Sequence, residues 1–359
     1  MKKFFIIAAA ALVAITACTK IEDIDTAPAK KITFQAASYV PQTKANVSIM
    51  PEFTSFPCKA FLHAAGYSET QNMFGDNGET ISAYTSGDVV TTTPSQVAYW
   101  APSHDYYWPK DATSYVNFVA WYDKNGAPTT STETSLVWSN RTIQTSDNIL
   151  FADEAWHYKQ TPSAAYHMES GVSEGVPMLF HHALAQLCIK ANVTKNTDDK
   201  TPAHTWDVTL EDITLAGVFN TGTLSLTNSD LGSTGTKAWT GSWATSGTAG
   251  SVTMSNVTTP LTTDAVDVLT MQNVLPQTVT DNVVLNFKYN ISYKYNGEEY
   301  AHEKITAALQ LNNITNAISA WEMNKKITYT ITINPETTVI RIDPAMVDWE
   351  PVAGGTATL

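Results

Sequence analysis

The sequence predicts an all-β protein built from two tandem domains, and three observations lead to that expectation. The chain has 359 residues, which is too long for one ordinary hydrophobic core, so two domains of about 150 residues each are expected. Short runs in which apolar and polar residues alternate occur in both halves, with turn dipeptides such as Asn-Gly between them. No stretch of about 11 or more residues has a convincing helical period, so helices should be short and few.

The composition limits the partners that the chain can bind. Hydrophobic residues make up 43% of the chain and charged residues 15%, which is typical of a well-packed globular protein. The formal net charge of −13 argues against nucleic acid and anionic lipid surfaces, because those partners need basic patches. The three cysteines, Cys18, Cys58 and Cys188, are too few for a disulfide framework or a cysteine zinc site. A Cys58–Cys188 bridge and two buried free thiols are the alternatives.

Residues 1–17 have the organisation of a lipoprotein signal peptide. Two lysines precede an apolar run over residues 4–13, which is too short to span a bilayer. The run leads to Ile-Thr-Ala-Cys at residues 15–18, the bacterial lipobox pattern. We therefore expect Cys18 to become the lipidated first residue, held on a membrane by acyl chains that contribute about 0.8 kcal/mol per buried CH₂ group. An ordinary secretory peptide or a membrane anchor is the alternative.

The next segments are an acidic tether, residues 18–31, for which a plain solvated linker is the alternative, and an alternating strand, residues 32–40. The apolar side of this strand consists of Ile32, Phe34, Ala36 and Val40. Residues 41–45, with the sequence PQTKA, are a turn that should expose the peptide bond after Lys44.

Two further stretches predict strands around the middle of the chain. Residues 115–122, YVNFVAWY, are apolar on both faces, which is typical of a central strand buried from two sides. Residues 176–193 contain a strand, a short His-Ala-Leu-Ala segment and a second strand with Leu187 and Ile189 on its apolar face. We interpret this stretch as the start of a second domain.

The second half of the chain has the clearest β pattern. Residues 283–295 and 298–309 flank Asn296-Gly297, the strongest two-residue hairpin signal. Residues 327–333 alternate apolar residues with threonines, which indicates a half-buried strand.

No group of residues in the sequence predicts catalysis or metal binding. Residues 171–175 match the G-x-S-x-G pattern of hydrolases, but a polar loop precedes them and a strand follows, which is the inverse of the required context. His181 and His182 are adjacent on a strand, so their side chains point to opposite faces and cannot share one ion. We therefore expect no enzyme activity, no metal and no cofactor, and we interpret the two histidines as core or turn residues.

Four blocks of sequence, in their order along the chain, resemble signatures of the fimbrillin family, surface pilus lipoproteins of Bacteroidales-type bacteria. The blocks are YWP at residues 107–109 with the strand at 115–122, QTSDNILFA at 144–152, FHHALA at 180–185, and residues 321–333 followed by 347–349. Together with the lipobox they cover nearly the whole chain. One departure is Asn324, which stands where the family usually has Gly.

This resemblance implies a fold and a mode of assembly. The fold would be two transthyretin-like β-sandwich domains, residues 32–170 and 171–359. The protein would be a structural subunit of a surface pilus, exported as a lipoprotein to the outer face of the outer membrane, where the acidic tether would direct it. Assembly in the family proceeds by donor-strand exchange after a protease removes the first strand.

The resemblance also implies the residues that act in assembly. Family members cut by an Arg-specific protease have Arg at the cleavage position, so here Lys44, Lys31 or Lys30 would have to serve. The groove left by residues 32–40 would accept a C-terminal strand from another subunit. The donor segment would be residues 344–359, and its candidate anchors are Val347, Trp349 and Val352. The expected partners are other pilus subunits, a processing protease and, through the lipid, the outer membrane.

The alternative function is that of a surface-anchored lipoprotein that never polymerises and binds glycans or host ligands. Aromatic rings stack on carbohydrate faces when they are exposed. Trp239 and Trp243, in a segment rich in Gly, Ser and Thr, are the tryptophans that we expect to be exposed.

Overall fold

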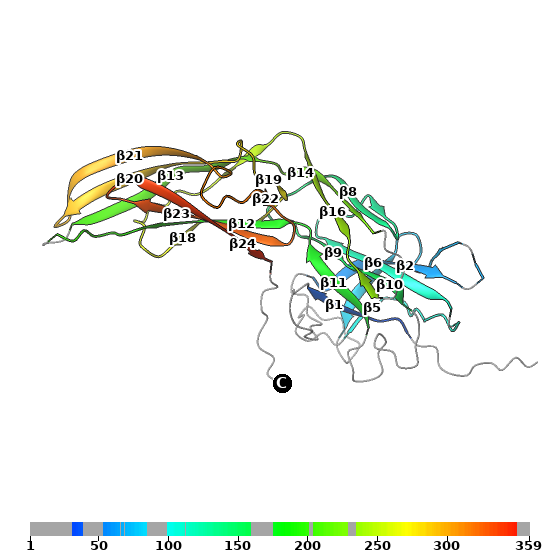
Figure 1. Cartoon of the computed structure of the whole chain (residues 1–359). Helices are drawn as coiled ribbons and strands as arrows, with labels where there is room; N and C mark the ends of the chain where they lie inside the picture. Colours follow the sequence, from blue (N-terminus) through cyan, green and yellow to red (C-terminus); the bar gives the residue numbers. More distant parts are fainter. Residues whose placement is uncertain are drawn as a thin grey trace, which may run out of the picture.

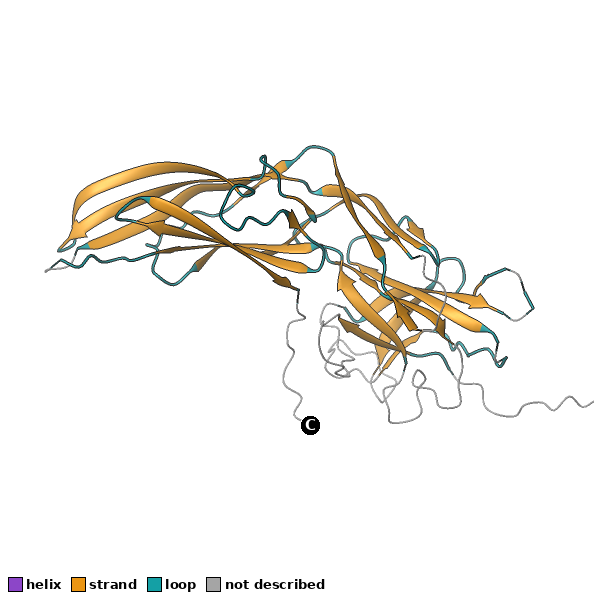
Figure 2. Ribbon diagram, in the orientation of Figure 1, coloured by secondary structure: helices purple, strands orange, loops and turns teal. Residues whose placement is uncertain are grey.

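The computed structural model describes residues 31–38, 53–64, 66–67, 69–84, 99–111, 113–158, 175–200, 204–228 and 235–349. Every regular element among them is a β-strand (Figure 2), so the all-β prediction is confirmed, and no helix occurs in these ranges. Within the same ranges, no helix is long and apolar enough to cross a membrane.

The largest sheet has ten strands, in the order β15-β10-β6-β9-β11-β1-β5-β4-β2-β3. They are β1 (Phe34–Ser38), β2 (Ser55–His63), β3 (Gln71–Asn72), β4 (Glu79–Tyr84), β5 (Tyr99–Pro102), β6 (Tyr115–Asp123), β9 (Ile149–Ala152), β10 (Glu154–Tyr158), β11 (Val176–His182) and β15 (Gly235–Lys237). Strand β2 also pairs with β6. The strands β6-β9-β11-β1-β5-β4-β2 therefore form a closed ring, which we call the strand ring.

Opposite sides of the strand ring pack against each other through aromatic side chains. The ring of Phe34 on β1 lies 5.2 Å from that of Phe118 on β6, edge to face. Phe56 on β2 and Phe180 on β11 make a similar contact at 5.0 Å. These edge-to-face pairs are a favoured aromatic geometry and belong to one buried core. The ring is thus filled as a β-sandwich is filled, by side chains from facing strands.

A second sandwich is built from two four-stranded sheets (Figure 1). The first sheet, which we call the C-terminal sheet, has the order β18 (Val266–Val274), β12 (Ala185–Val193), β23 (Lys325–Asn334) and β24 (Val339–Asp348). The facing sheet has the order β17 (Gly250–Thr253), β13 (Thr205–Val218), β20 (Val284–Tyr295) and β21 (Glu298–Gln310). Alternate side chains of both sheets form one core that includes Ile189, Phe287, Tyr289 and Ile331. The alternation thus places apolar residues between the two sheets.

A third sheet contains strands from both halves of the chain, β16 (Thr240–Ser246), β14 (Thr221–Thr227), β8 (Ser135–Thr142) and β7 (Thr130–Ser131). Strand β14 pairs with β8 along Leu224↔Trp138 and its neighbours. A third core contains residues of this sheet together with Trp121, Leu184 and Trp349. A short pair, β19 (Gln277–Thr278) with β22 (Ala320–Trp321), completes the described strands. Segments distant in sequence therefore share one core between the strand ring and the second sandwich.

Two predicted stretches have the expected structure. Residues 176–193 form β11, a turn and β12, with Leu187 and Ile189 buried. The hairpin β20–β21 is closed by Asn296 and Gly297, whose φ values of 48° and 85° lie in the left-handed region that Asn and Gly tolerate. The stretch 176–193 also connects the strand ring to the C-terminal sheet, because β11 pairs in one and β12 in the other.

Both described cysteines are free thiols, so the disulfide alternative is wrong. Cys58 lies in the core of the strand ring, and burial raises the pKa of its thiol. Cys188 lies on β12 in a different sheet, and its thiol donates to the Asp267 carboxylate at 3.8 Å. Two thiols that belong to separate sheets have no common turn or strand pair that would bring them together.

Candidate functional site

The first strand, β1, is an internal member of the strand ring. It pairs in parallel with β11, from Phe34↔Val176 to Ser38↔Phe180, and meets β5 through Phe34↔Trp100. Backbone bonds flank the strand: the Ile32 N–H donates to the Tyr106 carbonyl and the Val176 N–H donates to the Thr33 carbonyl, both at 2.8 Å. Without this segment, β11 and the connection that follows β5 would lose these partners.

The side chains of this strand fill the core of the ring. Ile32 is 2% exposed, and Phe34 and Ala36 are fully buried. Phe34 contacts Phe118 and lies 6.4 Å from Phe74. The predicted apolar side is therefore buried at these three positions. Val40, the fourth residue of the predicted set, lies outside the described residues.

The candidate processing and lipid-attachment residues are mostly outside the described ranges. Cys18, Lys30 and Lys44 are not described. Lys31 is exposed at the start of the strand segment, and its Nζ lies 2.7 Å from the Asp105 carboxylate. The position of β1 still distinguishes the three lysines, because a cut after Lys30 or Lys31 leaves β1 attached to the domain. A cut after Lys44 separates β1 from the rest of the ring.

Gly175 permits the close approach of β1 to β11. A Cβ atom at Gly175 would lie 2.5 Å from the Phe34 carbonyl carbon and 2.8 Å from its Cα and N atoms. From the sequence, Gly175 is singled out only as the last residue of the G-x-S-x-G match. Residues 171–174 of that match lie outside the described residues. The structural reason for Gly175 is thus steric, and nothing in the local sequence pattern indicates it.

We predict that Gly175→Ala displaces β1 and lowers the free energy of unfolding by about 1–3 kcal/mol, the usual range for overpacking. Denaturant unfolding measures the change. Gly250→Ala is the matched control, because the nearest atom to its added Cβ would be the Val218 carbonyl oxygen at 3.8 Å, an ordinary contact. Equal stability of the two variants would show that β1 does not press against Gly175.

The C-terminal strand β24 lies at the edge of the C-terminal sheet and, among the described strands, pairs with β23 alone. Val347, a candidate donor residue, is 59% exposed near the end of this strand. Trp349, the next candidate, is 6% exposed in the third core. Val352 lies outside the described residues. The two described candidates thus differ: one is presented to solvent and the other is packed inside its own chain.

A contact with His182 on β11 holds Trp349 in place. The two rings are stacked, with centroids 3.5 Å apart and planes 2° from parallel. The backbone N–H of Trp349 donates to the Asn324 carbonyl at 2.9 Å, and the backbone N–H of Asn324 donates to the Leu184 carbonyl at 3.1 Å. Asn324 has a φ of 60°. Asn is one of the few residues that adopt this left-handed conformation readily, which explains why Asn can replace the usual Gly here.

The two neighbouring histidines have separate environments, as their alternation on a strand predicts. His182 is 1% exposed, and burial, followed by the charges of Lys326 and His181, lowers its pKa to about 3. Its imidazole is therefore neutral near pH 7. His181 Nε2 lies 2.8 Å from the Asp153 carboxylate. Among the described residues, no group of three His, Cys, Asp or Glu side chains could hold a metal ion.

Trp239 and Trp243 are buried, so the prediction that they are exposed is wrong. They are 8% and 9% exposed. Their indole N–H groups donate to the carbonyls of Ala152 and Ala183, at 2.9 and 2.7 Å. Each ring thus packs in the third core with its polar atom paired, and neither can stack on a sugar.

Comparison with known proteins found one matching family model and several similar solved structures. A family model described as fimbrillin-like matches residues 66–349. A search among curated proteins gives no match. Among solved structures, a fimbrial protein from Bacteroides vulgatus ATCC 8482 is 15% identical with a TM-score of 0.48, covering 89% of this chain and 100% of that one. A candidate cell adhesion protein from Bacteroides uniformis ATCC 8492 is 13% identical with a TM-score of 0.46, covering 90% and 99%.

Proposed function

The chain belongs to the fimbrillin-like family, and from this premise we propose that it is a pilus subunit which joins its neighbours by donor-strand exchange. The family is one of structural rather than enzymatic proteins, of the pilus and cell-adhesion type. Export as a lipoprotein through Cys18 is part of the proposal. The proposal also includes attachment to the outer membrane and processing by a protease before assembly.

One observation carries the proposal: a single short strand, β1, completes a closed ring and fills its core. Its buried Phe34 alone contributes about 1.5–3 kcal/mol of apolar burial. If β1 leaves, an apolar groove remains between β11 and β5, and its edges present unpaired N–H and C=O groups. A strand from a neighbour can restore both kinds of contact, because main-chain bonds provide affinity and alternate pockets provide register.

Cleavage after Lys44 fits this mechanism better than cleavage after Lys30 or Lys31. The strand β1 ends at Ser38, so a cut after Lys44 is the one of the three that releases it from the domain. The same cut would also separate the lipid on Cys18 from the assembled subunit. Lipidation would therefore hold the precursor on the membrane until processing.

The proposed donor is the C-terminal segment 344–359 of a neighbouring subunit. Val347 supports this assignment because its apolar side chain is already 59% exposed on an edge strand. Trp349 would have to leave the stack with His182 before it could enter another subunit. Donation therefore requires the end of β24 to open.

Mass spectrometry of the N-terminus, on protein isolated from its native surface, tests the proposal. We expect acylated Cys18 in the membrane-bound precursor and Ala45 as the first residue of the assembled subunit. Cys18→Ala should release the protein from membranes or block its maturation. Assembled material that still contains residues 32–40 would contradict strand exchange and favour the non-polymerising lipoprotein.

A further inference from the structure

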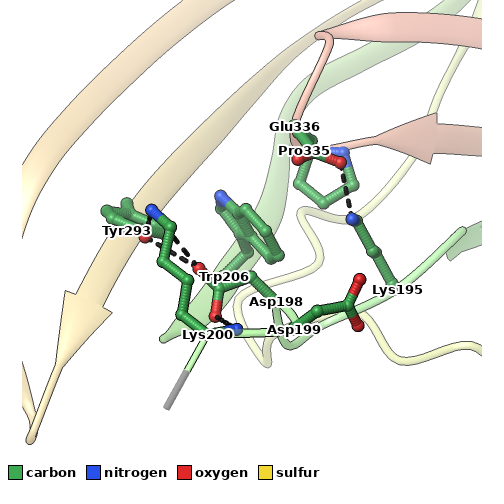
Figure 3. A pocket seen from close by; sticks show the side chains of 8 residues that line it. All are labelled: Lys195, Asp198, Asp199, Lys200, Trp206, Tyr293, Pro335 and Glu336. Carbon is green, nitrogen blue, oxygen red and sulfur yellow. Dashed lines mark hydrogen bonds and ion pairs between the residues drawn. The ribbon is translucent and has the colours of Figure 1, made fainter. Parts of the chain in front are cut away.

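A pocket of about 440 Å³ lies at one end of the second sandwich. Figure 1 shows this end, with the turn of the β20–β21 hairpin, far from the strand ring. The pocket is formed by the β12–β13 connection, the first residues of β13, the last residues of β20 and the turn between β23 and β24. Figure 3 shows the ring of Trp206 among the lining side chains, with Lys195 and Lys200 on different sides of it.

A row of aromatic rings leads out of this pocket toward the hairpin turn. Trp206 lies 5.4 Å from Tyr293, and Tyr293 is stacked on His204 at 4.8 Å with planes 7° apart. His204 in turn lies 4.8 Å from Tyr295, and Tyr295 lies 6.0 Å from Tyr300. Trp206 is nearly buried, whereas Tyr300 is 67% exposed. The row therefore extends from the interior of the pocket to an open surface.

The charges of the pocket are nearly balanced, and both of its ammonium groups are already paired. Lys195 lies 2.5 Å from Glu336, and its ammonium group is 5.3 Å from the centre of the Trp206 ring. Lys200 lies 3.6 Å from Asp198 and donates to the Tyr293 hydroxyl at 3.0 Å. With Asp199, the lining has three carboxylates and two ammonium groups. An anionic ligand would meet a small net negative charge and would have to displace existing ion pairs.

The polar groups are held in place before any ligand binds. The Asp198 carboxylate accepts the backbone N–H groups of Lys200 and His204 at 3.1 and 2.9 Å and the Tyr293 hydroxyl at 3.0 Å. Burial alone would raise its pKa, but the bonds from His204, Lys200 and Tyr293 outweigh burial and lower the pKa to about 2. A fixed carboxylate beside a fixed ring reduces the ordering that a ligand must cause.

We propose that this pocket and the aromatic row bind a neutral oligosaccharide. Sugar rings offer apolar C–H faces that pack on exposed aromatic rings, so Tyr300 at the outer end of the row is the stacking surface, while the buried Trp206 forms part of the pocket wall. Sugar hydroxyl groups both donate and accept hydrogen bonds, so one ligand can donate to the carboxylates and accept from the ammonium groups. Pockets with a few convergent polar groups and aromatic walls are typical ligand sites. The site shares no residue with the proposed strand exchange, so the two proposals can fail independently.

Binding of the purified, uncut full chain to a glycan array tests this inference. The array should hold neutral oligosaccharides of hexoses and N-acetylhexosamines, together with their sulfated and sialylated counterparts. We expect the protein to bind neutral members and to bind the anionic counterparts more weakly. No binding to any neutral member, or stronger binding to the anionic ones, would overturn the proposal.

Tyr300→Ala and Tyr67→Ala form a matched pair for the neutral glycan that binds. The two tyrosines are 67% and 70% exposed, but Tyr67 lies between β2 and β3, away from the pocket. Tyr300→Ala should weaken affinity about tenfold, which corresponds to the loss of one stacking contact. Tyr67→Ala should leave affinity unchanged. If both variants bind as the unaltered chain does, the row only packs the hairpin and binds no sugar.

A second variant tests the polar part of the same site. Glu336→Gln removes one carboxylate and the ion pair with Lys195, while it keeps the size of the side chain. It should weaken binding of the neutral glycan without lowering the thermal midpoint of unfolding, because the pair is partly exposed and such pairs add little stability. Unchanged affinity would place the glycan outside the pocket and overturn the assignment.

Discussion

Replacing Lys44 by Gln is expected to keep the subunit monomeric under a digestion that converts the unaltered protein into oligomers. Digestion with a Lys-specific protease should cut the unaltered chain after Lys44 and free β1. The open groove between β11 and β5 would then take up a strand from another subunit. Size-exclusion chromatography measures oligomers, and mass spectrometry of the digested protein locates the cut.

Two controls distinguish strand exchange from other effects of digestion. Replacing Lys30 and Lys31 together by Gln should change nothing, because a cut at either residue leaves β1 in the ring. The ion pair between Lys31 and Asp105 is more than half exposed, so its loss should have little effect on stability. A chain truncated after Asp343 should be cut yet stay monomeric, since it lacks the proposed donor. If the cut full-length chain stays monomeric, strand exchange is wrong.

Local patterns in the sequence predict individual strands well, and the reason is physical. The β20–β21 hairpin depends on Asn296 and Gly297, two residues that tolerate positive φ, so the signal and the structure lie in the same place. The strand pair at residues 176–193 depends on alternation, which reports burial on one face. Both features are set by residues that are neighbours in the chain.

The same patterns do not predict which strands pair when they are far apart in the sequence. The parallel pairing of β1 with β11 joins residues 34 and 176, and the pairing of β8 with β14 joins residues 138 and 224. Alternation shows that a strand has an apolar face but not which strand will lie beside it. Closure of the strand ring by β2 and β6 has no local signal either.

Local composition also failed to predict whether a tryptophan is exposed or buried. Trp243 lies on a strand whose neighbours are small and polar, yet its ring is covered by a core with residues from both halves of the chain. The sequence also did not indicate the pocket at the end of the second sandwich, because Lys195, Trp206, Tyr293 and Glu336 come from four separate segments. Composition describes the segment, whereas burial depends on what the fold places above it.

Trp349→Ala should lower the free energy of unfolding by about 3–5 kcal/mol, the usual range for removal of a large buried ring. The ring is 6% exposed in the third core and stacks on His182 at 3.5 Å. The backbone N–H of residue 349 donates to the Asn324 carbonyl, and alanine keeps this bond, so the loss of stability reports the ring alone. Denaturant unfolding of the uncut monomer measures the loss.

Val347→Ala is the matched variant, because Val347 is a donor candidate that contributes little to its own subunit. Its side chain is 59% exposed, so its removal should change the free energy of unfolding by less than about 0.5 kcal/mol. Under Lys-specific digestion, Val347→Ala should still slow the formation of oligomers, since the neighbour's groove would lose an apolar anchor. Normal assembly by this variant would exclude Val347 from the donor strand.

The pH dependence of the Trp349→Ala effect tests whether the stack with His182 causes it. The pKa of His182 is lowered from 6.5 to about 3 in the folded protein, mainly by burial. As the pH falls below 6.5, the unfolded chain gains a proton that the folded chain does not, so stability is lost progressively toward pH 3. Without Trp349, the His182 ring is less buried and its pKa returns toward 6.5, which makes this acid loss smaller. The difference in unfolding free energy between the two proteins should therefore be largest above pH 6.5 and should decrease on acidification. A difference that is constant from neutral to acid pH would show that the ring of Trp349 does not bury His182.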